Sequence, residues 1–398
     1  MGGGIANAKD ALAVAVREHP ALRAKRSELT ATQSDVEVAR WQYWATPTVS
    51  VSKPDKSFIA GTDRSVSSVG VRQPLWTGGR LEAGVSYAQA RNQTAQASLE
   101  ETRRDIALET IQTWGEVCSA QARVGVYEAS LQAHQKFLQQ IKRRTQSGLS
   151  VQSDIALASS RLDAVLADLA GARVSLQAAL ERLRTLTDNH PVKAYALPQR
   201  LLSDTLTEDD VQAALQLDPS LVRLNSELRE LQAQIDSSKA AYWPELYANV
   251  TQRHGDVTGK VNQIAIGFES RWGAGLSNTA AVQAGLLRMQ AKQEDIEFRT
   301  RKLTEQIRGD QQQLQASRAR MQAYRQALAS ANDVARSWDR QFAAGKKSWQ
   351  EVMNAAREST QTEIQLVDAT GASAVLDWRL AVLTRGIEWV LQSPKVQP

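Results

Sequence analysis

Residues 71–80 read VRQPLWTGGR, and this stretch joins two kinds of sequence pattern. Where it begins, Val69 and Val71 alternate with small or polar residues, a period of two that is typical of a β-strand. After it, residues 81–147 contain no proline, and apolar residues recur at heptad spacing. Gly78 and Gly79 give the backbone the freedom to bend between the two. The stretch therefore predicts a strand that turns into a very long helix.

The same arrangement occurs a second time, about two hundred residues later. His19-Pro20 recurs as Asp218-Pro219 with an offset of 199, whereas Gly148 recurs as Gly345 with an offset of 197. A two-residue insertion just before Pro47 accounts for the difference. A repeat of this length indicates a duplicated structural unit.

Each repeat is predicted to run helix, strand, turn, strand, very long helix, short turn, helix. The first repeat covers residues 8–187, a linker without periodicity covers 188–206, and the second repeat covers 207–391. The two long helices, 81–147 and 278–344, would each be about 100 Å long. The shorter helices are predicted at 8–43, 152–187, 207–242 and 349–386, and each is about half that length. The simplest packing therefore places one long helix against two short ones in each repeat, which gives a rod.

The four predicted strands have one apolar face. In the second repeat, Ile264, Ile266 and Phe268 alternate with polar or small residues, and Leu246 and Val250 do the same in the preceding strand. No other apolar segment is left to cover that face. Four strands cannot close into a barrel, so their edges stay open unless several chains combine them.

Composition excludes several classes of protein. We expect the net charge of +5 to be spread along the chain, which predicts solvated helix faces rather than a nucleic-acid-binding surface. No stretch approaches about 20 uncharged apolar residues, so a membrane role must come from the strands. The four histidines lack metal-ligand spacing and no nucleophile motif surrounds them. We predict no catalytic residues, no metal site and no cofactor, and Cys118, as the only cysteine, has no partner for a disulfide.

The decisive stretch closely resembles the strand-to-helix transition of the TolC family of outer membrane channels, which ends a strand in Q-P-L-aromatic-x-G-G-R. Here Gln73, Pro74, Trp76, Gly78 and Gly79 match that motif. The second copy keeps an aromatic residue and a glycine, Trp272 and Gly275, but has lost the Gln-Pro. With the duplication and the helix lengths, the resemblance covers roughly residues 8–390.

The resemblance implies a mostly α fold with a small β part. Three identical chains with four strands each would close a 12-stranded β-barrel in the outer membrane of a Gram-negative bacterium. Their helices would continue it as a trimeric α-helical barrel, a periplasmic tunnel. The partners it implies are outer membrane lipid, a periplasmic adaptor (membrane fusion) protein, and an inner-membrane transporter of ABC or RND type at the helical tips.

Tryptophans cluster where helices and strands are predicted to meet. They would form an aromatic girdle at the membrane interface, or else pack at the end of the sheet in the ordinary way. They are Trp41, Trp44, Trp76, Trp243 and Trp272.

In the TolC family, polar links between neighbouring helices close the tunnel at the hairpin tips, and acidic side chains form rings there. By resemblance, Ser153 and Asp154 match a polar pair on the first tip, and Glu351 matches a constriction carboxylate on the second. Lys347 replaces an arginine, which keeps the charge but loses the bidentate fork, and it is a candidate partner for Asp154. Asp154 and Glu351 would equally suit early-helix acids that the macrodipole stabilises. Two departures remain, Phe342 in place of a hydrogen-bonding tyrosine and Asn354 in place of a second carboxylate.

The expected function is that of a passive exit duct in a tripartite export system. Type I protein secretion is favoured over multidrug efflux because many efflux members carry a lipid-anchor cysteine near the amino terminus, and none is seen near this start. A soluble coiled-coil periplasmic adaptor is a remote alternative, since it would need one hairpin and compact β-domains. An enzyme is not expected.

Overall fold

A computed structural model describes residues 4–52, 65–193, 195–202, 206–270 and 277–393. The chain divides into two compact units, and each contains parts of both sequence repeats. Unit 1 comprises residues 1–22, 102–217 and 302–398, and unit 2 comprises residues 23–101 and 218–301. The long helices therefore contribute their first part to unit 2 and their second part to unit 1.

The long helices are present as predicted. Helix α3 spans Arg80–Gln146 and α7 spans Ser277–Ala343, 67 residues each and displaced by one residue from the expected bounds. After each comes a tight turn and a shorter helix, α4 at Gln152–Leu186 and α8 at Trp349–Arg385. A last short helix, α9, spans Ile387–Gln392. Among the described residues, no helix is both long enough and apolar enough to cross a membrane.

The other two predicted helices are each divided in two. Residues 8–43 form α1 (Ala8–Glu18) and α2 (Pro20–Trp41), and residues 207–242 form α5 (Glu208–Leu217) and α6 (Pro219–Ala240). Proline lacks the N–H that would continue a helix and disfavours helical backbone in the residue before it. A new helix therefore starts at each proline, and Asp218 caps the second by accepting a hydrogen bond from Leu221 N at 2.9 Å.

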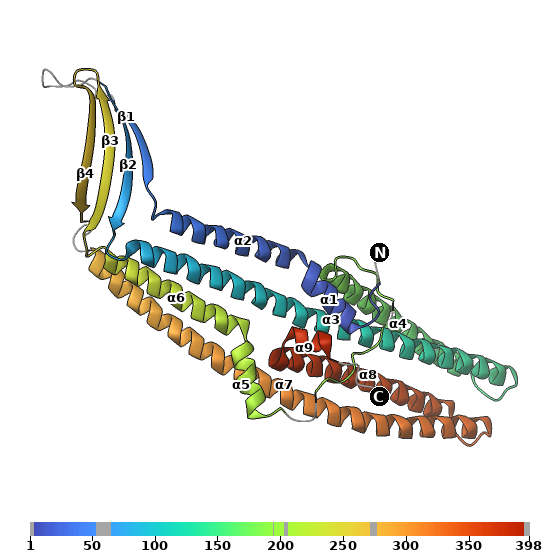
Figure 1. The fold of residues 1–398 in the computed structure, drawn as a ribbon. Coiled ribbons are helices and arrows are strands. Elements are labelled where there is room, and N and C mark those ends of the chain that lie inside the picture. Colours follow the sequence, from blue (N-terminus) through green and yellow to red (C-terminus); the bar gives the residue numbers. More distant parts are fainter. Residues whose placement is uncertain (1–3, 53–64, 194, 203–205, 271–276, 394–398) are drawn as a thin grey trace. The chain divides into compact units, whose positions relative to one another are not determined.

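Unit 2 contains one antiparallel sheet in the order β1-β2-β3-β4 (Figure 1). Its strands are Thr46–Ser52, Val66–Trp76, Glu245–Gly255 and Gly259–Glu269. The register places Val71 beside Val250 and Val250 beside Ile264, so the apolar residues of neighbouring strands share one face. That face is uncovered in the single chain, with Val49, Ile264 and Phe268 exposed by 75%, 81% and 79%. The predicted alternation is confirmed, and β1 and β4 are edge strands.

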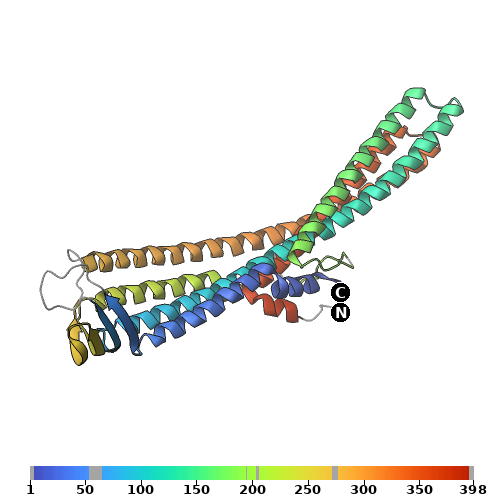
Figure 2. The same ribbon diagram turned by 90° about the horizontal axis from the view of Figure 1, so that it is seen from above.

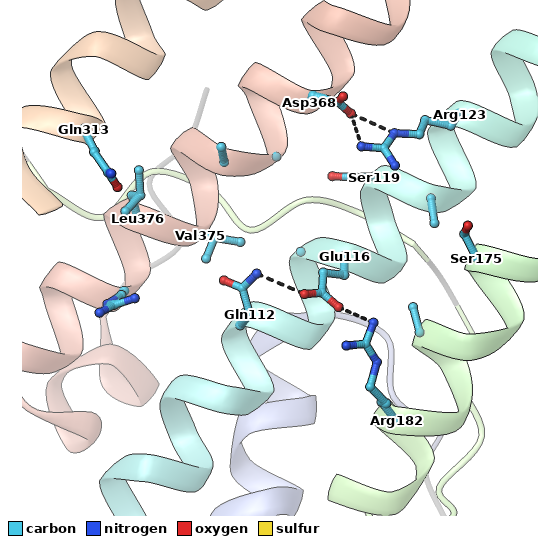
Figure 3. Close-up of a pocket in the computed structure, with 16 residues that line it drawn as sticks. Gln112, Glu116, Ser119, Arg123, Ser175, Arg182, Gln313, Asp368, Val375 and Leu376 are labelled. Carbon is cyan, nitrogen blue, oxygen red and sulfur yellow. Dashed lines mark hydrogen bonds and ion pairs between the residues drawn. The ribbon is translucent and has the colours of Figure 1, made fainter. Parts of the chain in front are cut away.

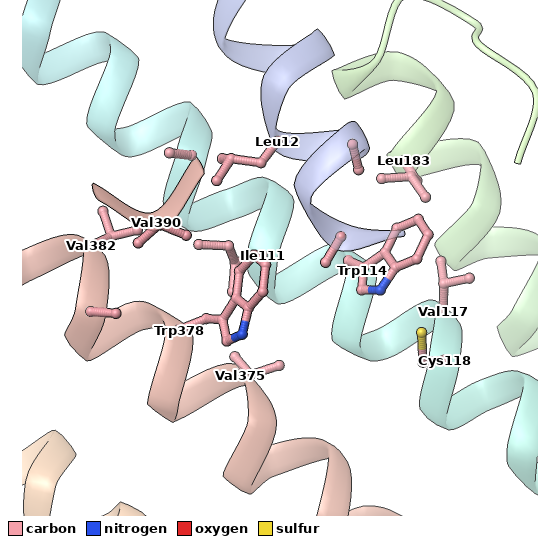
Figure 4. Packing of buried hydrophobic residues seen from close by; sticks show 14 of the residues in the cluster. Leu12, Ile111, Trp114, Val117, Cys118, Leu183, Val375, Trp378, Val382 and Val390 are labelled. Atoms are coloured by element: carbon pink, nitrogen blue, oxygen red, sulfur yellow. The ribbon is translucent and has the colours of Figure 1, made fainter. Parts of the chain in front are cut away.

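Unit 1 contains the main hydrophobic core (Figure 4). Leu12 of α1, Trp114 of α3, Leu183 of α4 and Trp378 of α8 are buried there. The two indoles also hold the inter-repeat linker: Trp114 Nε1 donates to Ala196 O at 3.0 Å, and Trp378 Nε1 donates to Gln199 O at 2.7 Å. These two bonds fix the linker to the core at Ala196 and Gln199.

Candidate functional site

Unit 1 has two helical hairpins whose turns are the two predicted tips (Figure 2). Tip 1 joins α3 to α4 through residues 147–151, and tip 2 joins α7 to α8 through residues 344–348. Gly148 and Gly345 both have φ of +73°, in the left-handed region that favours glycine. A Cβ at either position would meet nothing within 4 Å, so backbone conformation alone selects the glycines.

In tip 1, Asp154 is held by its own turn. Its carboxylate accepts hydrogen bonds from Ser150 Oγ at 2.6 Å and from Val151 N at 3.3 Å. These bonds, the Ser150 hydroxyl first, lower the pKa of Asp154, and a hydrogen bond from the Trp349 side chain in the other hairpin adds to the effect. Ser153 is exposed on the first turn of α4. Asp154 thus caps α4 and also links the two tips.

In tip 2, Glu351 closes a capping box with Ser348. Its carboxylate accepts from Ser348 N at 3.0 Å and Ser348 Oγ at 2.9 Å, and Lys347 Nζ lies 2.6 Å from its other oxygen. The Lys347 bond and then the Ser348 bonds lower the pKa of Glu351 to about 2. Within the chain, Lys347 therefore contacts Glu351, and its pairing with Asp154 stays a prediction. Asn354 is exposed one turn further along α8.

The two tips share a small hydrophobic core, which is formed by Ile141, Ala158, Phe342, Trp349, Val352 and Met353. Arg144 covers it from tip 1: its guanidinium carbon lies 4.5 Å from the centre of the Phe342 ring, and its Nη1 donates to Phe342 O at 3.0 Å. Phe342 was predicted from the sequence, whereas Trp349 and Arg144 were not. The repeat offset carries a signal for Trp349, since it stands where the first repeat has the polar Gln152.

The strand–helix transition is also built around hydrogen bonds and close packing. Gln73 Nε2 donates to Tyr43 O and to Pro74 O, both at 2.8 Å. The pairing of β2 with β3 shifts register between Pro74 and Trp76: Pro74 lies opposite Tyr247, and Trp76 lies opposite Leu246. The predicted Trp272 and Gly275 lie outside the described residues.

The two glycines of the transition have different neighbours. Gly78 has φ of +62°, and a Cβ there would lie 2.7 Å from Trp243 Cβ. Gly79 has φ of +93° with nothing within 4 Å. Trp76 packs edge-on against Trp243, with ring centres 6.3 Å apart. Both glycines thus adopt left-handed backbone, and Gly78 also leaves room for the close approach of Trp243.

Beside the transition, a cavity of about 450 Å³ is bordered by charged residues of the sheet. Arg72 lies over the Tyr247 ring, 3.7 Å from its centre, and reaches Glu269 at 2.8 Å. Arg80, the first residue of α3, pairs with Glu245 at the start of β3. These ion pairs connect strands and helix at the end of the sheet.

A second cavity, of about 560 Å³, lies among α3, α4, α7 and α8 in unit 1 (Figure 3). Ion pairs between helices form its polar lining: Arg123 lies 2.5 Å from Asp368, and Arg182 lies 2.6 Å from Glu116. α3 and α8 approach closely here, because a Cβ on Gly115 would lie 2.1 Å from Val375 Cγ2. The arrangement ties helices together, and it offers no group of three or more metal-ligating side chains within the described residues.

Comparison with known proteins connects this geometry to a family. The family described as outer membrane efflux protein matches residues 11–189 and 211–383, most of both repeats. The chain belongs to that family. It is a channel protein of the outer membrane that takes part in efflux or secretion, and the predicted TolC-family membership is confirmed.

Three relatives show the range of the family. The cobalt-zinc-cadmium resistance protein CzcC of Cupriavidus metallidurans is 25% identical, covering 91% of this chain and 85% of that protein. The outer membrane protein TolC of Vibrio cholerae is 24% identical, over 74% of this chain and 70% of TolC. The proteases secretion protein PrtF of Dickeya chrysanthemi is 24% identical, over 93% and 88%. The described fold agrees: the outer-membrane channel OprN superposes with a TM-score of 0.83 at 15% identity, covering 96% of this chain and 90% of OprN.

Proposed function

We propose that three copies of this chain form a passive exit duct through the outer membrane, as the outermost part of a tripartite export system. The uncovered apolar face of the sheet carries the proposal. An exposed face with Val49, Ile264 and Phe268 is costly in water but suited to lipid. The open edges of β1 and β4 would pair between neighbouring chains, so that twelve strands close on themselves.

The tryptophans at the end of the sheet support this placement in lipid. Trp41, Trp44 and Trp243 are all exposed by 60% or more, and Trp76 by 48%. Indoles with an apolar ring and a polar N–H favour the membrane–water interface. A band of such side chains beside an apolar sheet face fits a girdle better than it fits packing within one chain.

Disulfide trapping tests the assembly. In a Cys118→Ala background, Ser50→Cys on β1 combined with Gln263→Cys or Ala265→Cys on β4 samples the register between edge strands. We expect covalent dimers and trimers in the outer membrane fraction for at least one pair. Ser68→Cys on the interior strand β2, with the same β4 cysteines, is the control. Monomers with every edge pair would refute the trimer.

For the cargo, we propose protein secretion of type I. The similarity to PrtF, a proteases secretion protein, extends over 93% of this chain and supports that assignment. The similarity to CzcC, a cobalt-zinc-cadmium resistance protein, extends over 91% of this chain and favours efflux as the second candidate. Deletion of the gene separates them: loss of secreted protein with unchanged drug and metal susceptibility supports secretion, and the reverse supports efflux.

We further propose that the tips form the periplasmic entrance, where a periplasmic adaptor and an inner-membrane transporter of ABC or RND type dock. Asp154 and Glu351 would then provide one acidic position per tip, with Asn354 in place of another carboxylate. We propose no catalytic role and no cofactor for either carboxylate.

Conductance in planar bilayers tests the entrance. Asn354→Asp adds a carboxylate to an exposed position, so we expect higher cation selectivity and stronger block by divalent cations than in the wild type. Asn332→Asp, in α7 away from the tip turns, is the control. Identical selectivity and block in Asn354→Asp and wild type would refute the placement of residue 354 in the conducting path.

A further inference from the structure

The net positive charge of the chain is concentrated at the two tips. We define a window around each turn glycine that includes the twelve residues on either side: residues 136–160 around Gly148 and residues 333–357 around Gly345. Together the two windows contain nine Lys or Arg and four Asp or Glu. The whole chain has 48 Lys or Arg and 43 Asp or Glu, so the remaining 348 residues contain 39 basic and 39 acidic residues. The expectation of a charge spread along the chain is therefore wrong: the whole excess of +5 lies in these windows.

The carboxylates of the tips are already occupied within the chain. Asp154 accepts from Ser150 and Val151, Glu351 is bound by Lys347 and Ser348, and Asp333 pairs with Arg336 at 2.6 Å. Asp339, the fourth carboxylate of the windows, is exposed and takes no part in the contacts named above. The other acids therefore stabilise turns and helix starts while remaining charged, and the four negative charges leave an excess of five positive charges at the tips.

Several of the cations, in contrast, point to solvent. Lys142, Arg143, Arg340 and Lys346 are all exposed at the two tips. Arg143 and Arg340 are equivalents in the repeat, each five residues before its turn glycine. Both tips thus present a guanidinium at the same place, although the residues after the glycines differ.

We propose that the tips dock a periplasmic protein partner through a carboxylate-rich surface, with Arg143 and Arg340 as the equivalent contact points. This inference rests on the proposed function, which brings the partner to the tips; what it adds is the chemistry of the contact. Guanidinium groups bind carboxylates through two parallel hydrogen bonds and steer acidic surfaces toward them. A trimer would present the arginine six times around the entrance, which favours a partner that also repeats its acidic surface.

The experiment uses the full-length channel. A photo-crosslinking amino acid at Leu149, an exposed side chain of tip 1, identifies the partner in cells and the peptide it contacts. Binding of that purified partner to the channel in nanodiscs is then measured at 50 and 300 mM NaCl. Since the Debye length shortens with salt, we expect affinity to fall roughly tenfold or more between the two conditions.

Charge reversal isolates the arginines. The pair Arg143→Glu and Arg340→Glu should weaken binding at 50 mM NaCl roughly tenfold or more, whereas Arg143→Lys with Arg340→Lys should keep most of it. The matched control is Arg288→Glu with Arg325→Glu, two exposed arginines outside both windows, which should change affinity less than about twofold. Replacing the partner's contacting carboxylates by lysine should restore binding to the reversed channel.

Three results would overturn the inference. One is partner binding that is independent of salt and of charge reversal, which leaves the exit-duct proposal standing with another kind of contact. Another concerns phosphatidylglycerol vesicles. If the wild-type channel binds them, and charge reversal abolishes that binding but leaves partner binding unchanged, then the acidic ligand of the arginines is a lipid surface and not a protein. The last is the absence of any periplasmic protein crosslinked at Leu149, which refutes docking at the tips together with this inference.

Discussion

The two hairpin tips have the same backbone but different side-chain networks. Each turns at a glycine with φ of +73°, and each following helix begins with an acid that binds its own turn. Tip 1 has no lysine beside Asp154, while tip 2 surrounds Glu351 with Lys347 and Ser348. The duplication thus preserved what the chain reversal requires, and it left the contacts between hairpins free to diverge.

The largest difference is expected at the first helical position after each turn, Trp349 in tip 2 and Gln152 in tip 1. Trp349 is buried in the shared core and hydrogen-bonds Asp154, whereas Gln152 is exposed. Trp349→Ala should destabilise the tips by about 3 kcal/mol or more, through lost burial and the cavity left behind. Gln152→Ala should stay within about 0.5 kcal/mol.

Hydrogen exchange of the intact channel measures both variants locally. A loss of about 3 kcal/mol corresponds to roughly 100-fold faster exchange in residues 137–158 and 338–353. Exchange at the sheet should not change. If both variants were equally mild, the tips would be held by their separate turns and not by the shared core.

The sequence predicted most of the helices and strands, but it did not predict the contacts of the tips. Periodicity and the absence of proline gave α3 and α7 to within one residue, because heptad spacing and strand alternation are local patterns. The breaks at Pro20 and Pro219 were missed although proline is a local signal too. Arg144 on Phe342 could not be foreseen, since it joins residues 198 positions apart that only packing brings together.

An intermediate and equal effect is expected at the two turn glycines. Gly148→Ala and Gly345→Ala each place a Cβ in the left-handed region with no neighbour to clash, so each should cost about 1 kcal/mol through backbone strain alone. Gly125→Ala is the control, because that glycine lies within α3 with open space around it, and alanine there should be neutral or stabilising. Local hydrogen exchange gives the three values. Unequal losses of stability in the two tips would show that the two turns differ in backbone strain although their glycines have the same φ.

The smallest effect concerns the dependence of each tip on pH. Both carboxylates have a lowered pKa, so the stability that each contributes is present above its ordinary pKa and is lost as pH falls toward the lowered one. For Glu351 this window runs from 4.5 down to about 2. Lys347→Ala removes the first cause of that shift. The fall in protection of residues 348–352 against exchange, corrected for intrinsic rates, should therefore begin near the same pH as in the wild type, end at a higher pH, and be smaller in total. Tip 1 should be unaffected by the substitution, because Asp154 owes its lowered pKa first to Ser150, and Ser150→Ala should move only tip 1. A shift of both tips with either variant would mean that the two networks titrate as one, and that the tips differ in sequence but not in function.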